Sequence, residues 1–341
     1  MSEREVKIGL IGCGIIGPAH LAAWGSTPGA KISAICDLDE SKAKTYADKY
    51  GAIAYTDLAK MLKEADIDAL DICTPSGFHS TQGLMAIEAD KHVLIEKPID
   101  IDINKADKLI TAAEAKGLII ACIFQNRIGA EIIRAKQLID EGMLGTIISG
   151  STYMKWWRGQ DYYDSGEWRG TWALDGGVFS NQAIHAIDQL CWLCGPVKEV
   201  KYCHIDTVMH EIEAEDFGVA MLNFENGAYG VVEATTCCYP GAGMKTEIFG
   251  TKGSAVFEGP KVTLFEVQGE KIDLSSEDKE TSDGRSNPLA ISTDGLAVQI
   301  ANFADCIRNG GEPLVGARSA RVAIDALTKM YNKAGITKLG I

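Results

Sequence analysis

The most restrictive feature of this sequence is a regular alternation of short apolar runs and helical segments over its first 125 residues. The apolar runs cover residues 6–12, 30–37, 69–75, 92–98 and 118–124, with helix-like spacing between them. Strands separated by helices of this length form parallel sheets with crossover helices on both faces. The runs are apolar throughout rather than alternating, as in a sheet covered on both sides. The pattern therefore predicts a doubly wound α/β domain.

A glycine-rich turn follows the first apolar run and opens the first helical segment. It reads GCGIIG, with glycines at Gly12, Gly14 and Gly17. In a dinucleotide-binding turn the first glycine permits the tight turn, the second lets the backbone approach a pyrophosphate, and the third lets the helix pack on the strand. Ordinary turn glycines are the alternative. The strand before the turn and the helix after it favour the dinucleotide interpretation.

A carboxylate ends the second apolar run. Asp37 lies at this end, 20 residues after Gly17. A carboxylate in this position accepts hydrogen bonds from the adenosine ribose hydroxyls and repels a 2′-phosphate. The alternative is a solvated strand end. We therefore predict NAD, rather than NADP, as the cofactor.

Polar residues also end two later runs of the predicted sheet. Thr74 and Pro75 end one run, and Glu96, Lys97 and Pro98 end another. In open α/β sheets the ligand lies beyond the carboxyl ends of the strands. A carboxylate, an amine and a rigid turn residue are thus expected where the nicotinamide half of the cofactor lies.

The pattern changes after residue 125. The runs 147–158, 198–208, 215–236, 245–259 and 261–267 alternate polar and apolar residues, and Asn226-Gly227 is a hairpin signal. Helices are expected over residues 130–141, 179–194, 296–308 and 317–333, and residues 275–287 read as a loop. We predict a first domain over 1–125 and a second over 126–341, an α+β domain with an open, mostly antiparallel sheet.

Charge and cysteine content exclude several classes of function. The net charge of −14 opposes binding to nucleic acid or anionic membranes, although a locally basic pocket would admit an anionic small substrate. The sequence shows neither a signal-peptide pattern nor an apolar run of the roughly 20 residues that cross a bilayer. The ten cysteines are scattered, and Cys191 and Cys194 lie in an apolar helical segment without a second pair. We predict core thiols, no metal site and a cytoplasmic protein.

The most informative stretch of the second half is WRGTWALDGGVFSNQAIH, residues 168–185. Gly176 and Gly177 precede a predicted helix that carries Asn181 and His185 four residues apart, hence on one face. Taken singly, such residues are more often packing than catalytic, so this stretch alone is equally compatible with a core or a site. The aromatic and basic residues around it are Lys155, Trp156, Trp157, Arg158, Tyr162, Tyr163, Trp168, Arg169 and Trp172.

The order of these motifs resembles the glucose-fructose oxidoreductase / inositol dehydrogenase (Gfo/Idh/MocA) family. The glycine-rich turn, CTPSGFH at residues 73–79, EKP at 96–98 and DGG…NQAIH at 175–185 follow in the family's order over nearly the whole chain. The resemblance implies a Rossmann domain followed by an open antiparallel sheet that often forms an oligomer interface. We expect a homodimer or homotetramer through that sheet.

Within this family, PSGFHSTQ, QNR, YYDSGEWRGTW, NQAIH and IEAED resemble one branch. That branch includes UDP-N-acetyl-2-amino-2-deoxyglucuronate 3-dehydrogenases, which oxidise the C3 hydroxyl of the sugar. Inositol dehydrogenases usually carry an aspartate four residues before the histidine, where this chain has Asn181. The resemblance implies NAD-dependent oxidation of a secondary hydroxyl, with C3 favoured, of a sugar, glycoside or UDP-sugar.

The resemblance also implies roles for single residues. Lys97 and His185 face the substrate and act jointly on its hydroxyl, the amine with a pKa lowered by desolvation. Glu96 bonds the nicotinamide ribose. The predicted cofactor contacts are Gly12, Gly14, Ile15, Ile16, Gly17, Asp37, Thr74, Pro75, His79, Glu96, Lys97, Gln125, Trp168 and Arg169. The predicted substrate contacts are Lys97, Arg127, Lys155, Tyr163, Arg169, Asn181 and His185, with surface ion pairing the alternative for the basic ones.

Three other functions compete with this prediction. The first is an inositol or polyol dehydrogenase. The second is a redox-neutral glycoside hydrolase that oxidises, eliminates and reduces again, so that NAD is returned unchanged. The third is a non-catalytic NAD-binding regulator, which would need neither Lys97 nor His185.

Overall fold

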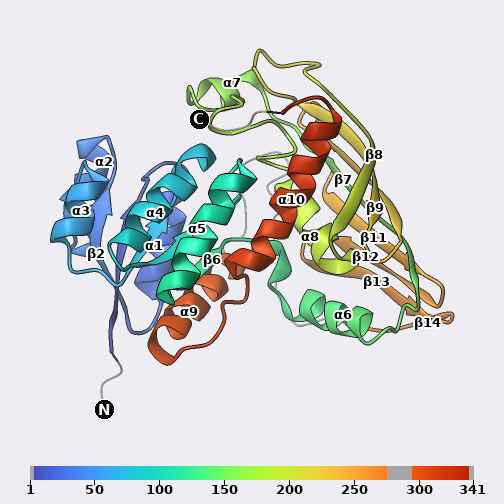
Figure 1. The fold of residues 1–341 in the computed structure, drawn as a ribbon, viewed down its shortest axis with the longest axis horizontal. Helices are drawn as coiled ribbons and strands as arrows, with labels where there is room; N and C mark the ends of the chain where they lie inside the picture. Colours follow the sequence, from blue (N-terminus) through green and yellow to red (C-terminus); the bar gives the residue numbers. More distant parts are fainter. Residues whose placement is uncertain (1–3, 275–293, 338–341) are drawn as a thin grey trace. The chain divides into compact units, whose positions relative to one another are not determined.

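The computed structural model describes residues 4–274 and 294–337 and divides into two compact units (Figure 1). The first unit comprises Met1–Ile123 and Thr293–Arg321, and the second comprises Phe124–Ser292 and Val322–Ile341. This division differs from the predicted domains 1–125 and 126–341, because a late segment joins the first unit. The loop predicted at residues 275–287 lies outside the described residues.

A six-stranded parallel sheet forms the first unit, with strand order β3-β2-β1-β4-β5-β6. This order is that of a Rossmann fold and confirms the predicted doubly wound domain. The strands are β1 (Val6–Ile11), β2 (Ala30–Cys36), β3 (Ile53–Tyr55), β4 (Ala69–Ile72), β5 (His92–Ile95) and β6 (Ile120–Cys122). The helices between them are α1 (Gly17–Ser26), α2 (Glu40–Tyr50), α3 (Leu58–Glu64), α4 (His79–Glu88) and α5 (Ile103–Lys116), with the 3-10 turn η1 (Ser76–Phe78).

Local sequence signals fix several helix ends in this unit. Asp39, Asp57 and Asp102 cap the N-termini of α2, α3 and α5 by accepting backbone N–H groups of the first turn. Gly51 and Gly117 end α2 and α5 in the left-handed conformation, with φ of 66° and 65°. Short-range chemistry thus sets the lengths of the crossover helices.

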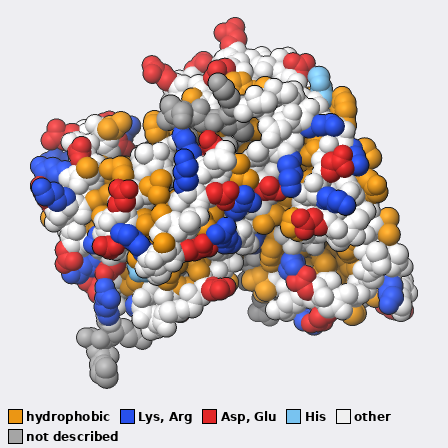
Figure 2. Space-filling model, viewed as in Figure 1, with side chains coloured by type: hydrophobic (Ala, Val, Ile, Leu, Met, Phe, Trp, Pro, Cys, Tyr) orange, Lys and Arg blue, Asp and Glu red, His pale blue; other side chains and the backbone are white. Residues whose placement is uncertain are grey.

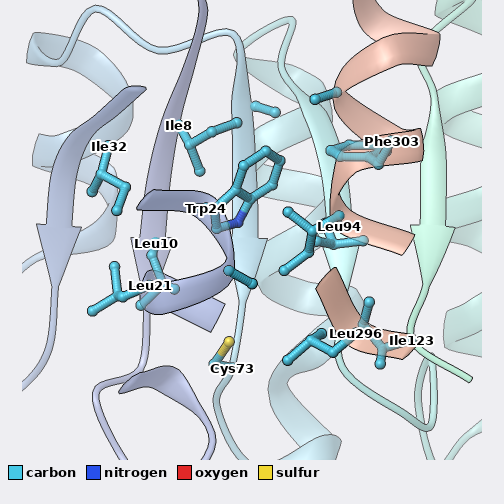
Figure 3. Close-up of a cluster of buried hydrophobic side chains, with 14 of the residues drawn as sticks. Ile8, Leu10, Leu21, Trp24, Ile32, Cys73, Leu94, Ile123, Leu296 and Phe303 are labelled. Atoms are coloured by element: carbon cyan, nitrogen blue, oxygen red, sulfur yellow. The ribbon is translucent and has the colours of Figure 1, made fainter. Parts of the chain in front are cut away.

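The core of the first unit is closed by a helix from the far end of the chain. Helix α9 (Asp294–Asn309) packs beside α1 and β1, and its Leu296 and Phe303 lie among the labelled core side chains of Figure 3. The Trp24 and Phe303 rings meet edge to face with centroids 6.4 Å apart. Burying side chains of this size stabilises the fold by roughly 1.5–3 kcal/mol each. This packing explains why residues 293–321 belong to the first unit.

The second unit is built on an eight-stranded sheet of order β14-β13-β12-β11-β7-β10-β9-β8. Strand β10 runs parallel to β7, and the other described pairs run antiparallel, which confirms the predicted mostly antiparallel sheet. The strands are β7 (Ile147–Lys155), β8 (Val197–Asp206), β9 (Phe217–Phe224), β10 (Tyr229–Thr235), β11 (Met244–Gly250), β12 (Gly253–Glu258), β13 (Lys261–Val267) and β14 (Glu270–Lys271). The helices are η2 (Gln125–Arg127), α6 (Ala130–Asp140), α7 (Gln160–Asp164), α8 (Ile184–Cys194) and α10 (Ala317–Lys333), the last beginning in the first unit.

The two faces of this sheet differ. Helix α8 covers one face so closely that a Cβ at Gly150 of β7 would lie 2.2 Å from the Cys194 sulfur. The opposite face exposes large apolar side chains on four strands, because β-register places them all on that side. They are Tyr202, Met221, Tyr229 and Phe249, which are 56%, 45%, 49% and 43% exposed. We define these four residues as the open-face patch.

The surface mixes charges of both signs. On the face drawn in Figure 2, Lys and Arg side chains are interspersed with Asp and Glu. Such a mixture differs from the clustered basic residues that bind nucleic acid. Within the described part of the chain, no helix is both long and apolar enough to cross a membrane.

Candidate functional site

The glycine-rich turn between β1 and α1 has the geometry that a dinucleotide needs. Gly12 has a φ of +99°, and a Cβ there would lie 2.6 Å from the Cys73 carbonyl oxygen. A Cβ at Gly17 would lie 2.2 Å from the Gly12 carbonyl oxygen, whereas one at Gly14 would meet nothing within 4 Å. Two glycines therefore allow close backbone packing, and Gly14 leaves open space on the side where a pyrophosphate approaches.

The acidic residue at the end of β2 is tied to this turn. One carboxylate oxygen of Asp37 accepts the Cys13 N–H at 2.7 Å, and the other accepts the Asp39 N–H at 2.9 Å. Ile15 is exposed at the turn and Ile16 packs against the core. Open backbone at Gly14 beside an anchored carboxylate fits the phosphate and adenosine ribose of NAD.

A buried histidine joins the segments that follow β4 and β5. The Nδ1 atom of His79 lies 2.7 Å from the Pro98 carbonyl oxygen, and its Nε2 atom lies 2.8 Å from that of Thr74. Both ring nitrogens therefore face backbone groups, and the side chain is buried. His79 therefore connects the segments after two strand ends, and its contact with the cofactor stays a prediction. Thr74 and Pro75 lie at the β4 end as predicted, with the Thr74 hydroxyl donating to Gln82 at 2.6 Å.

The EKP segment at the end of β5 is fixed by hydrogen bonds to the Glu96 carboxylate. One oxygen of the buried Glu96 carboxylate accepts the Lys97 N–H at 3.0 Å. Its other oxygen lies 3.0 Å from Nε2 of His20. The EKP motif indicates Glu96 and Lys97, whereas no motif in the sequence points to His20, which lies near the start of α1.

His20 belongs to a buried network within the first unit. Its Nδ1 atom lies 2.8 Å from a carboxylate oxygen of Asp71 in β4, and the Trp24 indole donates to the same oxygen at 2.8 Å. Burial lowers the pKa of His20, but the Asp71 charge more than offsets this and carries it well above its usual range. An aspartate inside the apolar run of residues 69–75 was the available signal, since a buried carboxylate requires a partner.

In the second unit, two basic residues predicted to bind substrate are already paired. Arg127 is buried and its guanidinium forms a two-pronged ion pair with Asp188 of α8. Lys155 pairs at 3.1 Å with Glu233, on the face of the sheet opposite α8, because it alternates with the inward Met154. Arg127 thus connects η2 to α8, and Lys155 lies on the open face of the sheet, while the substrate contacts expected of both stay predictions.

Arginines and aromatic rings pack together around α7, as the sequence crowding indicated. The Arg169 guanidinium lies 4.2 Å from the Tyr162 ring centroid and 4.4 Å from that of Trp168. Among the described residues, no carboxylate lies within ion-pairing distance of Arg169, although it lines an open cavity of about 400 Å³. Tyr163 lines the same cavity, with its hydroxyl 2.8 Å from that of Thr236.

The predicted helix around Asn181 and His185 begins later than expected. Helix α8 starts at Ile184, so Asn181 lies in the preceding turn rather than on the helix face of His185. The physical reason is Glu215, which accepts the N–H groups of residues 178 and 179 that a helix would leave to its first turn. Asn181 donates to the buried Asp175 at 2.5 Å, and His185 meets the Phe124 ring edge on, with centroids 5.9 Å apart. The side-chain amide of Asn181 is thus held by the Asp175 carboxylate.

Another buried histidine, His210, connects the loop before β9 to the segment around Arg158. His210 directs Nδ1 to Asp216 at 2.8 Å and Nε2 to the Arg158 carbonyl oxygen at 2.9 Å. Burial lowers the pKa of His210, but the bond to Asp216 more than compensates, raising it to about 10. Cys237 lies nearby, yet both imidazole nitrogens are already engaged, so the group acts as a loop brace.

Comparison with known proteins covers both units. The family model described as the oxidoreductase family with an NAD-binding Rossmann fold matches residues 6–124, and the GFO/IDH/MocA C-terminal domain matches residues 132–256. The chain is 30% identical to the WlbA dehydrogenase of Bordetella pertussis, crystallised with NADH and UDP-GlcNAcA, over 99% of each chain and with a TM-score of 0.85.

Two curated relatives from Bacillus subtilis are also similar. An uncharacterized oxidoreductase, YrbE, is 29% identical over 77% of this chain and 77% of its own length. A scyllo-inositol 2-dehydrogenase (NAD(+)) is 25% identical over 92% of this chain and 89% of its own. The similarity therefore extends to oxidoreductases with different named substrates.

Proposed function

We propose, from the premise that this chain belongs to the Gfo/Idh/MocA family of NAD-binding oxidoreductases, that it oxidises the C3 hydroxyl of an acidic UDP-sugar. The chain is an NAD-dependent oxidoreductase acting on a CH–OH group. The observation that carries the finer proposal is the full-length similarity to WlbA, whose structure holds NADH and UDP-GlcNAcA.

The residues of the first unit are assigned to the cofactor and to proton transfer. The backbone at Gly14 admits the pyrophosphate, and the Asp37 carboxylate receives the adenosine ribose hydroxyls. NAD, once bound, supplies the hydride acceptor. Lys97 follows a fixed strand end, so its amine is held for removal of the hydroxyl proton, and Glu96 bonds the nicotinamide ribose.

The residues of the second unit are assigned to the substrate. His185 is the second proton acceptor, and the Asp175–Asn181 pair orders the turn before it. Arg169 takes the carboxylate or diphosphate of the sugar nucleotide, because its planar guanidinium is stacked but not ion-paired within the described residues. Gln125 and Trp168 remain proposed cofactor contacts, and Tyr163 a proposed substrate contact.

The location and assembly of the enzyme complete the proposal. All ten cysteines are free, which fits a reducing compartment such as the cytoplasm. We assign the open-face patch to a homodimer or homotetramer interface, because aromatic residues and methionine are enriched at such interfaces.

NADH formation followed by absorbance tests the proposed reaction. Purified protein is given NAD or NADP with UDP-N-acetylglucosaminuronate, UDP-N-acetylglucosamine, glucosides, free hexoses and inositols. We expect NADH with the acidic UDP-sugar and a clear preference for NAD, and product analysis should find a 3-keto sugar. A preference for inositol would favour the second candidate, which rests on the similarity to scyllo-inositol 2-dehydrogenase. Cleavage of a glucoside without net NADH would contradict both.

A further inference from the structure

We propose that His20 is a positioning residue: by bridging Asp71 and Glu96 in the interior of the first unit, it fixes the Glu96 carboxylate and hence the start of the Lys97 segment. The inference rests on the proposed function, since it assigns this arrangement to the reaction that Lys97 serves. It adds a residue to the site that touches neither substrate nor cofactor.

The geometry links three segments of the first unit. His20 lies in the first turn of α1, Asp71 in β4 and Glu96 directly after β5. The two ring nitrogens lie 2.8 Å and 3.0 Å from the two carboxylates, and the other Glu96 oxygen accepts the Lys97 N–H at 3.0 Å. Because α1 also begins at the glycine-rich turn, one imidazole joins the phosphate end of the site to the Lys97 end.

The protonation state follows from the acceptors. A neutral imidazole carries one N–H, whereas two carboxylates facing both ring nitrogens each require a donor. The imidazolium satisfies both, and its positive charge offsets part of the cost of burying two negative groups. His20 is therefore a charged bridge that holds Glu96 in one orientation.

The arrangement excludes two other roles. A proton relay needs an exit to solvent at both ends, but on one side the hydrogen bonds of His20 lead to Asp71 and Trp24, which are both buried; Trp24 is labelled in the core of Figure 3. A metal site formed with Cys73 would need ligand lone pairs that are already used, because both His20 nitrogens face carboxylates and Asp71 also accepts from Trp24. Holding Glu96 in place is the remaining function.

The test compares His20→Gln with Trp24→Phe in the full-length protein. Glutamine carries both of its N–H donors on one nitrogen and so does not reproduce the two separate ring donors of an imidazolium, whereas phenylalanine removes the other donor to Asp71 without touching Glu96. We expect His20→Gln to lower kcat by at least tenfold, with NADH still binding one per chain and its Kd changed by less than threefold. Trp24→Phe should change kcat by less than threefold. A kcat in His20→Gln within threefold of wild type, or equal losses in both variants, would overturn the proposal.

A measurement on the unaltered protein covers the case in which His20→Gln does not fold. Nitrogen-15 NMR of labelled histidine distinguishes imidazolium from neutral imidazole, and the chain has only six histidines. A His20 ring protonated on both nitrogens at pH 7 is expected, and a neutral ring at pH 7 would refute the bridge. Failure of the proposed function is distinguishable, because it would appear as wild-type protein that forms no NADH with any sugar.

Discussion

Polar groups are held in different ways in the two candidate regions of the molecule. In the first unit, Glu96 is fixed between His20 and the Lys97 N–H by hydrogen bonds. In the second unit, the Arg169 guanidinium rests on two aromatic rings. A hydrogen bond fixes direction, whereas a stacked guanidinium keeps its N–H groups free to reorient toward a ligand. We infer that the first region fixes the geometry for chemistry and the second recognises the substrate.

Two of the buried histidines, His20 and His210, sharpen this contrast. Both His20 and His210 bond an aspartate through Nδ1. The second partner of His20 is a carboxylate of the site, whereas that of His210 is a backbone carbonyl in a loop. The same side chain therefore positions a site residue in one unit and a loop in the other, and its second partner decides which.

The largest expected effect tests whether Arg127 is structural. Arg127→Met leaves Asp188 buried without its partner, so the free energy of unfolding should fall by about 3–5 kcal/mol. Urea denaturation measures this, and Arg127→Met/Asp188→Leu should recover much of the loss. An unchanged midpoint combined with a raised KM for sugar would return Arg127 to the substrate site.

The next effect concerns the chemistry of the first region. Lys97→Ala should lower kcat at least about 100-fold, because general acid–base groups contribute roughly 10²–10⁴ in rate. The Kd of NADH, followed by fluorescence, should change by less than threefold, since we assign the phosphates and adenosine ribose to Gly14 and Asp37. Lys97→Arg is the matched control that keeps the charge without an amine that can be deprotonated. A kcat in Lys97→Ala equal to that of wild type would contradict the proposal that the first region carries the chemistry.

A smaller effect is expected in the second region. Arg169→Lys keeps the charge but loses the planar fork, so the KM for an acidic UDP-sugar should rise about tenfold with kcat within threefold. Lys155→Met is the control. Lys155 lies on the sheet face opposite α8 and pairs with Glu233, so this change should leave the KM for the sugar within twofold of wild type. Steady-state kinetics with both variants decides this, and a fall in kcat alone for Arg169→Lys would place the arginine with the chemistry instead.

Assembly provides a further test. Met221→Lys should place a charge in the middle of the open-face patch and shift the protein to smaller oligomers, because burying an unpaired charge opposes association. Size-exclusion chromatography with light scattering measures the mass. Ala115→Lys, an exposed change on α5 in the first unit, adds the same charge away from the sheet and is the control. A monomeric mass for the wild-type protein would contradict the proposed interface.

The smallest effect is a pH dependence of stability due to His210. Its pKa is raised to about 10, so its contribution is fully present below its unfolded-state pKa of about 6.5 and is lost as pH rises through 10. The difference in urea midpoint between wild type and His210→Asn should therefore shrink from pH 6 to pH 10. A difference that grows with pH would show that the bond to Asp216 does not need the imidazolium.

The strand ends of the first unit were predictable because topology places them. Parallel strands bring all their carboxyl ends to one edge, so Asp37, Thr74 and Glu96 could be assigned there from their positions after apolar runs. His20 escaped prediction, since nothing in a helical segment says which carboxylate lies across the sheet. The short strand β3 also escaped, because two of its three residues are exposed and give no apolar run.

The second unit was harder to predict because the partners of its candidate residues lie far away in the sequence. Lys155 could not be assigned to a sheet face without the register of β7, and Arg127 could not be paired with Asp188 without knowing how η2 meets α8. The late start of α8 depends on Glu215, more than thirty residues further along the chain. Long-range partners of this kind leave no local pattern.

The position of α9 has a consequence for synthesis on the ribosome. The six parallel strands are complete at residue 122, yet Phe303, which packs against Trp24, and Leu296 of the same core are translated some 170 residues later. The apolar surface that α9 covers therefore stays exposed on the nascent NAD-binding unit until the strands of the second sheet have been translated. A chain released before α9 is made would keep that apolar surface exposed, as partly folded intermediates do.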